Sequence, residues 1–276
     1  MPNFEILLKQ ARKDCRIAIE VWTDILRELL GDRLKWAYVK GSAIKNWSSP
    51  VDYVPLLSDL DIHLMLTDRC ELFSDNIHAF DRAIKISREY ETLFSLKNSD
   101  YLHLPRTQIV IVNKLLEEST FVTPRLKDVQ ILLGEPEENL PVSKDKIRQI
   151  DYHKLLELEA VLETLPESLI DRSGWDYWIF LRKINWRVSP APIRLLTQTY
   201  EDPQEIWSWN RTRISNELEK QGYTKIVKNY QGFYEKGWEL FLSKMQKTEV
   251  FRGMIMCAYH VLNESLRAVR RIVNNR

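Results

Sequence analysis

Two aspartates alternate with apolar residues in the segment 58–64 (SDLDIHL). Earlier in the chain, an apolar run over residues 34–39 is followed by a glycine–serine pair, Gly41-Ser42. That run, residues 34–39, is typical of a buried strand that leads into a tight turn. Because side chains in a strand alternate between two faces, we expect Asp59 and Asp61 to share one face. The chain is therefore constrained to bring a glycine turn and two carboxylates together.

This order of elements predicts chemistry on a nucleoside triphosphate. A glycine turn at the start of a helix lets phosphate oxygens approach free backbone N–H groups. The Ser42 hydroxyl and the Lys45 ammonium, one helical turn later, could add further contacts to the same phosphates. Asp59 and Asp61 supply the hard oxygen ligands that Mg²⁺, or Mn²⁺ in its place, prefers. Each piece alone has a plainer interpretation, a simple turn or a solvated Asp-x-Asp, but their joint order favours the functional one.

The stretches WAYVKGSAIKNW and LSDLDIHLML resemble the nucleotidyltransferase superfamily, which includes DNA polymerase β and the antibiotic and minimal nucleotidyltransferases. The resemblance covers roughly the first half of the chain. It implies an α/β fold with a mixed sheet, bound Mg²⁺, and transfer of a nucleoside monophosphate from a triphosphate, with ATP as the expected donor, releasing pyrophosphate. The acceptor is not identified and could be a small molecule, RNA or a protein.

The chain departs from the family pattern at a third acidic position. Family members commonly carry this acid on a later strand, whereas the segment 107–113 (TQIVIVN) has none, so that either Gln108 or Asn113 takes its place. An amide can coordinate a cation through its oxygen but cannot act as a general base near neutral pH. The alternative function is therefore a catalytically impaired module that binds a nucleotide or a protein partner.

Three further residues near these segments are candidates for a role in the site. Arg106, just before the third strand, could bind a phosphate, and His103 could exchange protons. His63 shares the face of the aspartates, but imidazole suits softer metals than Mg²⁺. A structural role is at least as common for each of these residues. The link between Ser42 and Asp59 is longer than is usual in the family, so we expect residues 48–56 (SSPVDYVPL) to loop out beside the site.

The periodicities predict a two-domain α/β (α+β) protein, with a mixed-sheet nucleotidyltransferase-like domain over residues 1–143 and an all-helical bundle over residues 144–276. In the first domain we expect helices over 3–30 and 76–97 and strands over 34–39, 59–66, 107–113 and 128–133. Asn3 can cap the first helix and Gly31 can end it. In the second domain we expect helices over 144–165, 174–187, 191–200, 203–220, 223–246 and 249–272.

The helical half is rich in tryptophan and in cations. Its tryptophans favour core packing, with base stacking as a weaker alternative. Its cations Arg182, Lys183, Arg187 and Arg194 either line a cleft toward an anionic ligand or, more commonly, form solvated helix faces. The net charge of +1 for the whole chain argues against nucleic-acid binding by bulk electrostatics.

The composition, 44% hydrophobic and 29% charged, is that of an ordinary globular protein. No apolar run is long enough to cross a membrane, and the first residues do not form a secretory signal, so we expect a cytoplasmic protein. Its three cysteines are far apart in the sequence, which favours reduced and mostly buried thiols. The sequence is also compatible with a homo-oligomer.

Overall fold

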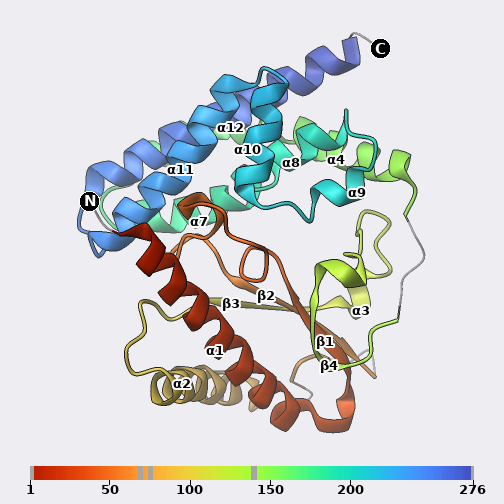
Figure 1. Cartoon of the computed structure of the whole chain (residues 1–276), viewed down its shortest axis with the longest axis vertical. Helices are drawn as coiled ribbons and strands as arrows, with labels where there is room; N and C mark the ends of the chain where they lie inside the picture. Colours follow the sequence, from red (N-terminus) through yellow and green to blue (C-terminus); the bar gives the residue numbers. More distant parts are fainter. Residues whose placement is uncertain (1–2, 68–70, 74–76, 138–141, 275–276) are drawn as a thin grey trace. The chain divides into compact units, whose positions relative to one another are not determined.

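The computed structural model describes residues 3–67, 71–73, 77–137 and 142–274, and the chain divides into two compact units (Figure 1). The first unit comprises Met1–Lys45 and Ser58–Leu140, and the second comprises Asn46–Leu57 and Pro141–Arg276. The first unit contains a sheet with helices, whereas the regular structure described in the second is helical. The predicted mixed α/β architecture with a helical C-terminal region is confirmed.

Four strands form one mixed sheet in the first unit, in the order β3-β2-β1-β4. β1 pairs with β2 and with β4 in antiparallel directions, and β2 pairs with β3 in parallel. The strands are β1 (Leu34–Lys40), β2 (Leu60–Leu66), β3 (Thr107–Ile111) and β4 (Gln130–Gly134). All four predicted strands are present, with ends that differ by one or two residues.

Helices α1 (Phe4–Leu30) and α2 (Ala79–Lys97) pack together, and α1 also contacts β1 and β4. The Asn3 side chain accepts hydrogen bonds from the first backbone N–H groups of α1, and Gly31, with φ of 48°, ends this helix. Both ends are those expected from the sequence. The rings of Trp22 on α1 and Tyr90 on α2 lie 5.0 Å apart and join the two helices.

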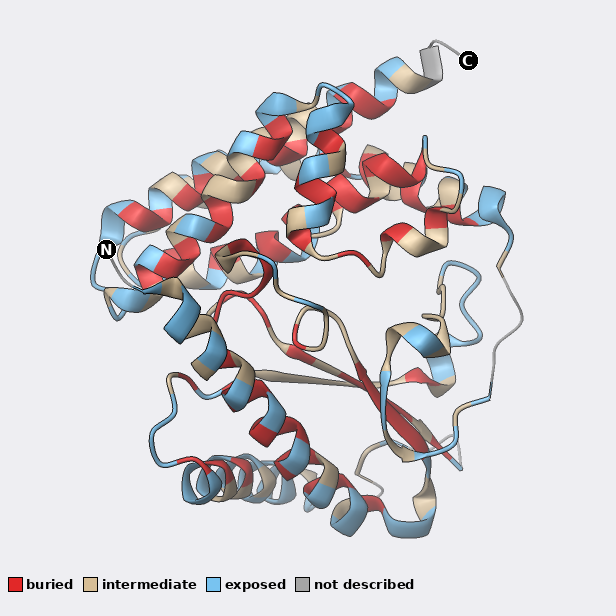
Figure 2. Cartoon of the chain, viewed as in Figure 1, coloured by how far each residue is buried: buried red, intermediate tan, exposed pale blue. Residues whose placement is uncertain are grey.

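β1 and β2 are mostly buried, whereas β3 is of intermediate burial (Figure 2). On one face of β2, Leu60, Ile62 and Leu64 are completely buried. On the other face, Trp36 and Tyr38 of β1 form an apolar cluster with the short helix α3 (Val112–Leu115). Polar residues of that second face include His63 in the middle of β2, and Lys40 and Asp61 at the end where β1 stops and β2 begins.

The second unit is built around α11 (Thr224–Leu242) and α12 (Thr248–Asn274), which pack along each other. α12 also contacts α4, α5, α7 and α8. The remaining helices are α4 (Lys144–Leu156), α5 (Leu158–Thr164), α6 (Glu167–Ile170), α7 (Asp176–Val188), α8 (Ala191–Thr197), α9 (Pro203–Ile206) and α10 (Arg211–Lys220). Large aromatic side chains, among them Phe233, Trp238 and Phe251, are almost completely buried in this unit.

The segment Asn46–Leu57 belongs to the helical unit, whereas the sequence predicts it within the first domain, residues 1–143. The buried Asp52 carboxylate accepts hydrogen bonds from the Thr212 N–H and hydroxyl, both at 2.8 Å. Arg211 donates to the Val51 and Asp52 carbonyls at 2.9 Å. Because buried polar groups need such partners, these contacts with α10 hold the segment in the second unit.

Among the described residues, no helix is both long and apolar enough to span a membrane. Cys15 is buried and Cys257 is half-buried, and both are free thiols. Cys70 lies outside the described residues.

Gly237 in α11 makes the approach of this segment possible. A Cβ at this position would lie 2.8 Å from Leu57 Cδ1 and 2.9 Å from Val54 Cγ1, two side chains that are almost completely buried. The backbone of α11 at Gly237 therefore packs directly against these two side chains.

We predict that Gly237→Ala destabilises the protein. Alanine in place of glycine inside a helix normally adds roughly 0.5–1 kcal/mol of stability. At Gly237 this gain is outweighed by overpacking, which costs about 1–3 kcal/mol. The matched control is Gly232→Ala in the same helix. A Cβ at Gly232 would lie 3.4 Å from Cys257 Sγ, an ordinary van der Waals distance. Chemical denaturation followed by circular dichroism should show opposite signs for the two variants, and equal stability would contradict the packing.

Candidate functional site

The end of β1 and the start of β2 bring three polar side chains into a row across the sheet. Asp61 is in register with Lys40 on the antiparallel strand β1 and with Gln108 on the parallel strand β3. Residues in register project from the same face, so the three side chains are neighbours. Asp59 immediately precedes β2 and lies close enough to raise the pKa of Asp61 by charge repulsion.

The turn after β1 lies directly against Asp61. Gly41 has φ of 87°, a conformation that favours glycine, and a Cβ there would lie only 2.6 Å from Asp61 Oδ2. The Gly41 carbonyl accepts from the N–H groups of Ile44 and Lys45 at 3.3 and 3.4 Å. The helix expected to start at Gly41 is therefore only a single turn, because the segment that begins at Asn46 already belongs to the helical unit.

Arg12 of α1 binds the backbone of this turn at residues 43 and 45. Its guanidinium donates to the Ala43 carbonyl at 3.0 Å and to the Lys45 carbonyl at 2.7 Å. Two carbonyls fixed by one planar side chain restrict the turn, and with it the direction of Ser42 and Lys45. No local sequence pattern indicates this role of Arg12, because its partners are backbone atoms far along the chain.

Burial and the charge of Asp59 raise the pKa of Asp61 to about 6. The positive charges of Lys40, Arg106 and Lys45 oppose this rise only in part. The site thus combines two acids with three cations, and Asp61 exchanges its proton close to neutral pH.

Arg106 forms an ion pair with Asp59. The Arg106 carbonyl accepts from the Leu60 N–H at 2.9 Å, which attaches the start of β3 to the start of β2. The side chains of Asp59 and Arg106 retain 16% and 30% of their exposure, so both remain open to solvent. In this structure Arg106 therefore balances a carboxylate that was expected to bind a metal.

The His103 side chain is buried and has a structural role. The buried Asp14 carboxylate accepts from the His103 N–H and lies 3.0 Å from its Nδ1, and it also accepts from the Asn98 side chain at 2.8 Å. Burial raises the pKa of Asp14, but these hydrogen bonds outweigh it and leave the pKa below its usual value. The cluster fixes the loop that leads to Arg106.

The two candidates for the third position separate clearly. The Asn113 side chain donates to the Leu66 carbonyl and accepts from the Leu66 N–H, both at 3.0 Å, so it extends the sheet. Gln108 instead lies in register with Asp61. Of the two amides, only Gln108 is placed beside the carboxylates.

His63 is part of the apolar cluster on this face. Its ring stacks on Tyr38 at 5.5 Å and on Phe121 at 6.5 Å, and only 5% of the residue is exposed. Burial, together with the charge of Lys40, lowers its pKa to about 3, so the ring is neutral. Within the described part of the chain, no group of three or more His, Cys, Asp and Glu side chains is arranged to hold a metal.

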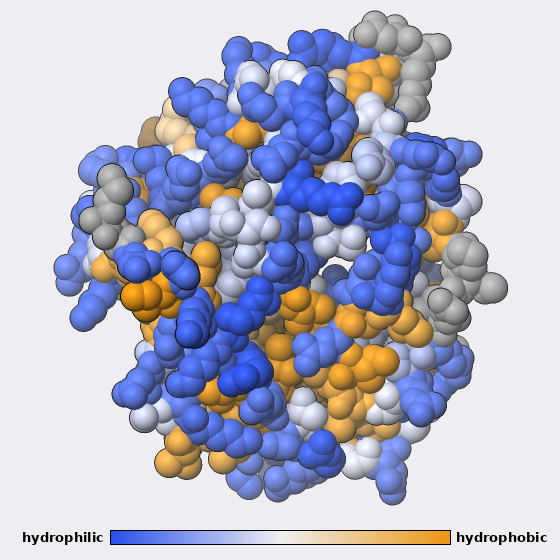
Figure 3. Space-filling model, in the orientation of Figure 1, coloured by the Kyte–Doolittle hydropathy of each residue, from blue (hydrophilic) through white to orange (hydrophobic). Residues whose placement is uncertain are grey.

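A cavity of about 800 Å³ adjoins the same turn from the side of α1. Figure 3 shows hydrophilic side chains along α1 and a hydrophobic surface next to them over the sheet. The lining includes neither Asp59 nor Asp61. Its polar part is mainly cationic, from Lys9, Arg12, Lys13 and Arg16, and its apolar part includes Ile6, Ile19 and Ile44. The cavity therefore adds positive potential near the turn.

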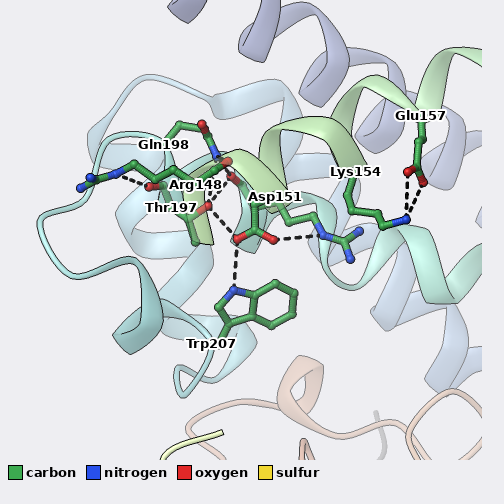
Figure 4. Close-up of polar contacts among 8 residues, drawn as sticks. Arg148, Asp151, Lys154, Glu157, Thr197, Gln198 and Trp207 are labelled. Carbon is green, nitrogen blue, oxygen red and sulfur yellow. Dashed lines mark hydrogen bonds and ion pairs between the residues drawn. The ribbon is translucent and has the colours of Figure 1, made fainter. Parts of the chain in front are cut away.

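In the helical unit, Asp151 lies in a polar network with Thr197 and Trp207 (Figure 4). Arg194 belongs to the same network. It lies 3.4 Å from the Asp151 carboxylate, which also accepts from Thr197 at 3.0 Å and from Trp207 Nε1 at 3.2 Å. Burial raises the pKa of Asp151 and lowers that of Arg194. The network joins α4 to α8 and to the residue after α9.

Comparisons of the chain with protein-family models, with curated proteins and with solved structures give no match. The interpretation of the site therefore depends on its residues and their geometry.

The pKa of Asp61 predicts an unusual dependence of stability on pH. Because its pKa in the folded protein lies above the ordinary 3.8, the native state binds more protons than the unfolded state between these values. The contribution of Asp61 to stability is therefore complete at low pH and is lost as the pH rises to about 6 and above.

In metal-free buffer, Asp61→Asn should match the wild type near pH 4 and exceed it by roughly 2 kcal/mol near pH 7.5. Asp59→Asn should lower the pKa of Asp61, because one negative neighbour is lost. Urea denaturation over the pH range and carboxyl NMR measure these two effects, with the exposed Asp145→Asn as control. A pKa of Asp61 that Asp59→Asn leaves unchanged would contradict the proximity of the two acids.

Proposed function

We propose that this protein is a Mg²⁺-dependent nucleotidyltransferase that transfers a nucleoside monophosphate from a nucleoside triphosphate, ATP being the expected donor, to an acceptor. The observation that carries the proposal is the contact of the Gly41 turn with Asp61, next to the charge of Asp59. A glycine turn and paired carboxylates are the two parts that such chemistry needs at one place.

The donor set fits a divalent cation. Asp59, Asp61 and the side-chain oxygen of Gln108 would hold Mg²⁺, since all three offer the hard oxygen atoms that it prefers. When bound, the cation would neutralise phosphate charge and stabilise the charge that develops during displacement. The pKa of Asp61 fits this role, because a cation replaces the proton that otherwise offsets its charge.

The residues of the turn and its neighbours bind and orient the triphosphate. The Ser42 hydroxyl and nearby backbone N–H groups donate to phosphate oxygens, and Lys45 adds a positive charge. With Asp59 holding the cation, Arg106 would be released from its ion pair with Asp59 and could bind a phosphate oxygen. An acceptor hydroxyl then forms a bond to the α-phosphorus, the bond between that phosphorus and the β-phosphate oxygen breaks, and pyrophosphate leaves.

The proton of the acceptor hydroxyl needs a destination, and this favours a second candidate function. Gln108 stands beside Asp61 and cannot accept the proton. If no other base serves, the protein is an impaired transferase that binds the nucleotide, or a protein partner, without turnover. The amide at position 108 is the specific observation behind this alternative.

Replacing both aspartates tests the first function. Asp59→Asn with Asp61→Asn should reduce metal-dependent pyrophosphate release by at least about a thousandfold, because the charges that hold the cation are lost. Binding of Mn²⁺, followed by electron paramagnetic resonance, should fall with it, while circular dichroism shows an intact fold. His63→Gln, which changes the same strand within the apolar cluster, is the control. Undiminished turnover in the double variant would refute the proposal.

Gln108→Asp separates the active from the impaired form. In an impaired transferase a carboxylate at this position should raise pyrophosphate release by on the order of a hundredfold, since general-base assistance is worth about 10²–10⁴ in rate. In an active enzyme that uses another base, the gain should be less than about tenfold. Gln130→Asp on β4 is the control for added negative charge in the same sheet. A loss of Mn²⁺ affinity in Gln108→Asp would contradict the placement of residue 108 at the metal site.

A further inference from the structure

One side of α7 exposes two tryptophans. Trp175, at the start of the helix, is 64% exposed, and Trp186, near its end, is 60% exposed. Ile179 between them is 54% exposed. Since large aromatic side chains dominate protein cores, two of them left in solvent on one helix need an explanation.

These side chains share one stripe because they recur at helical spacing, and Arg182 falls on the same stripe. The opposite side of α7 packs into the helical unit through Phe180, Leu181 and Ile184, all of them buried. The stripe is therefore not needed for packing this unit. The α7 face is defined here as Trp175, Ile179, Arg182, Lys183, Trp186 and Arg187.

The charge of the α7 face is positive. Lys183 and Arg187 are exposed beside the stripe, and Arg182 lies on it half-buried. The nearby carboxylate, Asp176, lies in the first turn, where the helix dipole stabilises a negative charge. This arrangement differs from that of Arg194, whose charge is matched by a buried carboxylate.

We infer that the α7 face binds a single-stranded nucleic acid. Indole rings in solvent are stacking platforms for bases, and interleaved cations bind the phosphates between them. Trp175 and Trp186 are eleven positions apart in the sequence, or about 16 Å along a helix, which gives room for several nucleotides. A duplex fits less well because its bases are already stacked, and a cationic small molecule would be repelled.

This inference goes beyond the proposed function and does not rest on it. Binding itself requires neither Mg²⁺ nor a triphosphate. Absence of strand binding would leave the transferase assignment standing, and absence of transfer would leave the binding surface standing. The two failures are thus distinguishable.

The test measures binding of fluorescein-labelled single strands of about 12 nucleotides, one RNA and one DNA of the same mixed sequence, to the full chain without Mg²⁺. Trp175→Ala and Trp186→Ala should each weaken binding at least about tenfold, given the worth of base stacking. Lys183→Ala with Arg187→Ala should reduce the slope of log affinity against log salt by about 0.7 for each cation removed. Equal binding of RNA and DNA indicates stacking alone, and preference for RNA indicates an added contact to the 2′-hydroxyl.

Two controls match these changes in other places. Phe80→Ala removes a 74% exposed aromatic from α2, and Lys228→Ala removes an exposed cation from α11. Neither should alter binding. The inference is overturned if the tryptophan variants bind like the wild type, if a duplex competes as well as a single strand, or if sedimentation shows a dimer that Trp186→Asp dissociates, which would make this face a contact between two copies.

Discussion

The close approach of the Gly41 backbone to the Asp61 carboxylate is the contact on which the rest of the candidate site depends. β1 ends at Lys40 in register with Asp61, so the chain must turn where that carboxylate emerges from the sheet. A side chain at position 41 would occupy the space of Asp61 Oδ2. The meeting of turn and acid thus follows from strand pairing and from one missing Cβ, and Arg12 limits how far the turn can move away.

The same contact determines the electrostatics of the site. Pressing a carboxylate against backbone removes water from it, and Asp59 adds repulsion, so Asp61 carries only part of its charge near pH 6. Arg106 offsets Asp59. Near pH 6, a proton on Asp61 and the guanidinium of Arg106 therefore offset much of the negative charge of the two aspartates.

What the sequence could predict was local. Strand alternation and the glycine turn identified Asp59, Asp61 and Gly41, and Asn3 and Gly31 marked the ends of α1. Lys40 was missed because the predicted strand ends at residue 39 and because its place opposite Asp61 depends on the register of β1 with β2. The predicted helix over 203–220 is broken into α9 and α10, and the Asn210 side chain, which accepts from the Arg213 N–H at 2.8 Å, is a cap that could have indicated the break.

Other features depend on partners distant in the sequence, and no local pattern contains them. The choice between Gln108 and Asn113 required the register of β2 with β3. The position of residues 46–57 is set by Arg211, whose guanidinium is buried over the Tyr234 ring at 3.9 Å and donates to carbonyls of this segment.

In the helical unit, the buried charged side chains Asp52, Asp151 and Arg211 have hydrogen-bond partners. Arg211 is satisfied by carbonyls and a ring, Asp52 by four donors from Ser48, Ser49 and Thr212, and Asp151 by its network. A buried charge without a partner would lower the stability of the fold by several kcal/mol, which explains why these side chains are paired. Folding does not impose the same demand on a surface, and the exposed tryptophans of α7 lose the free energy that their burial would have supplied. Because that loss has no counterpart in the packing of the unit, it is better explained by a ligand than by the fold.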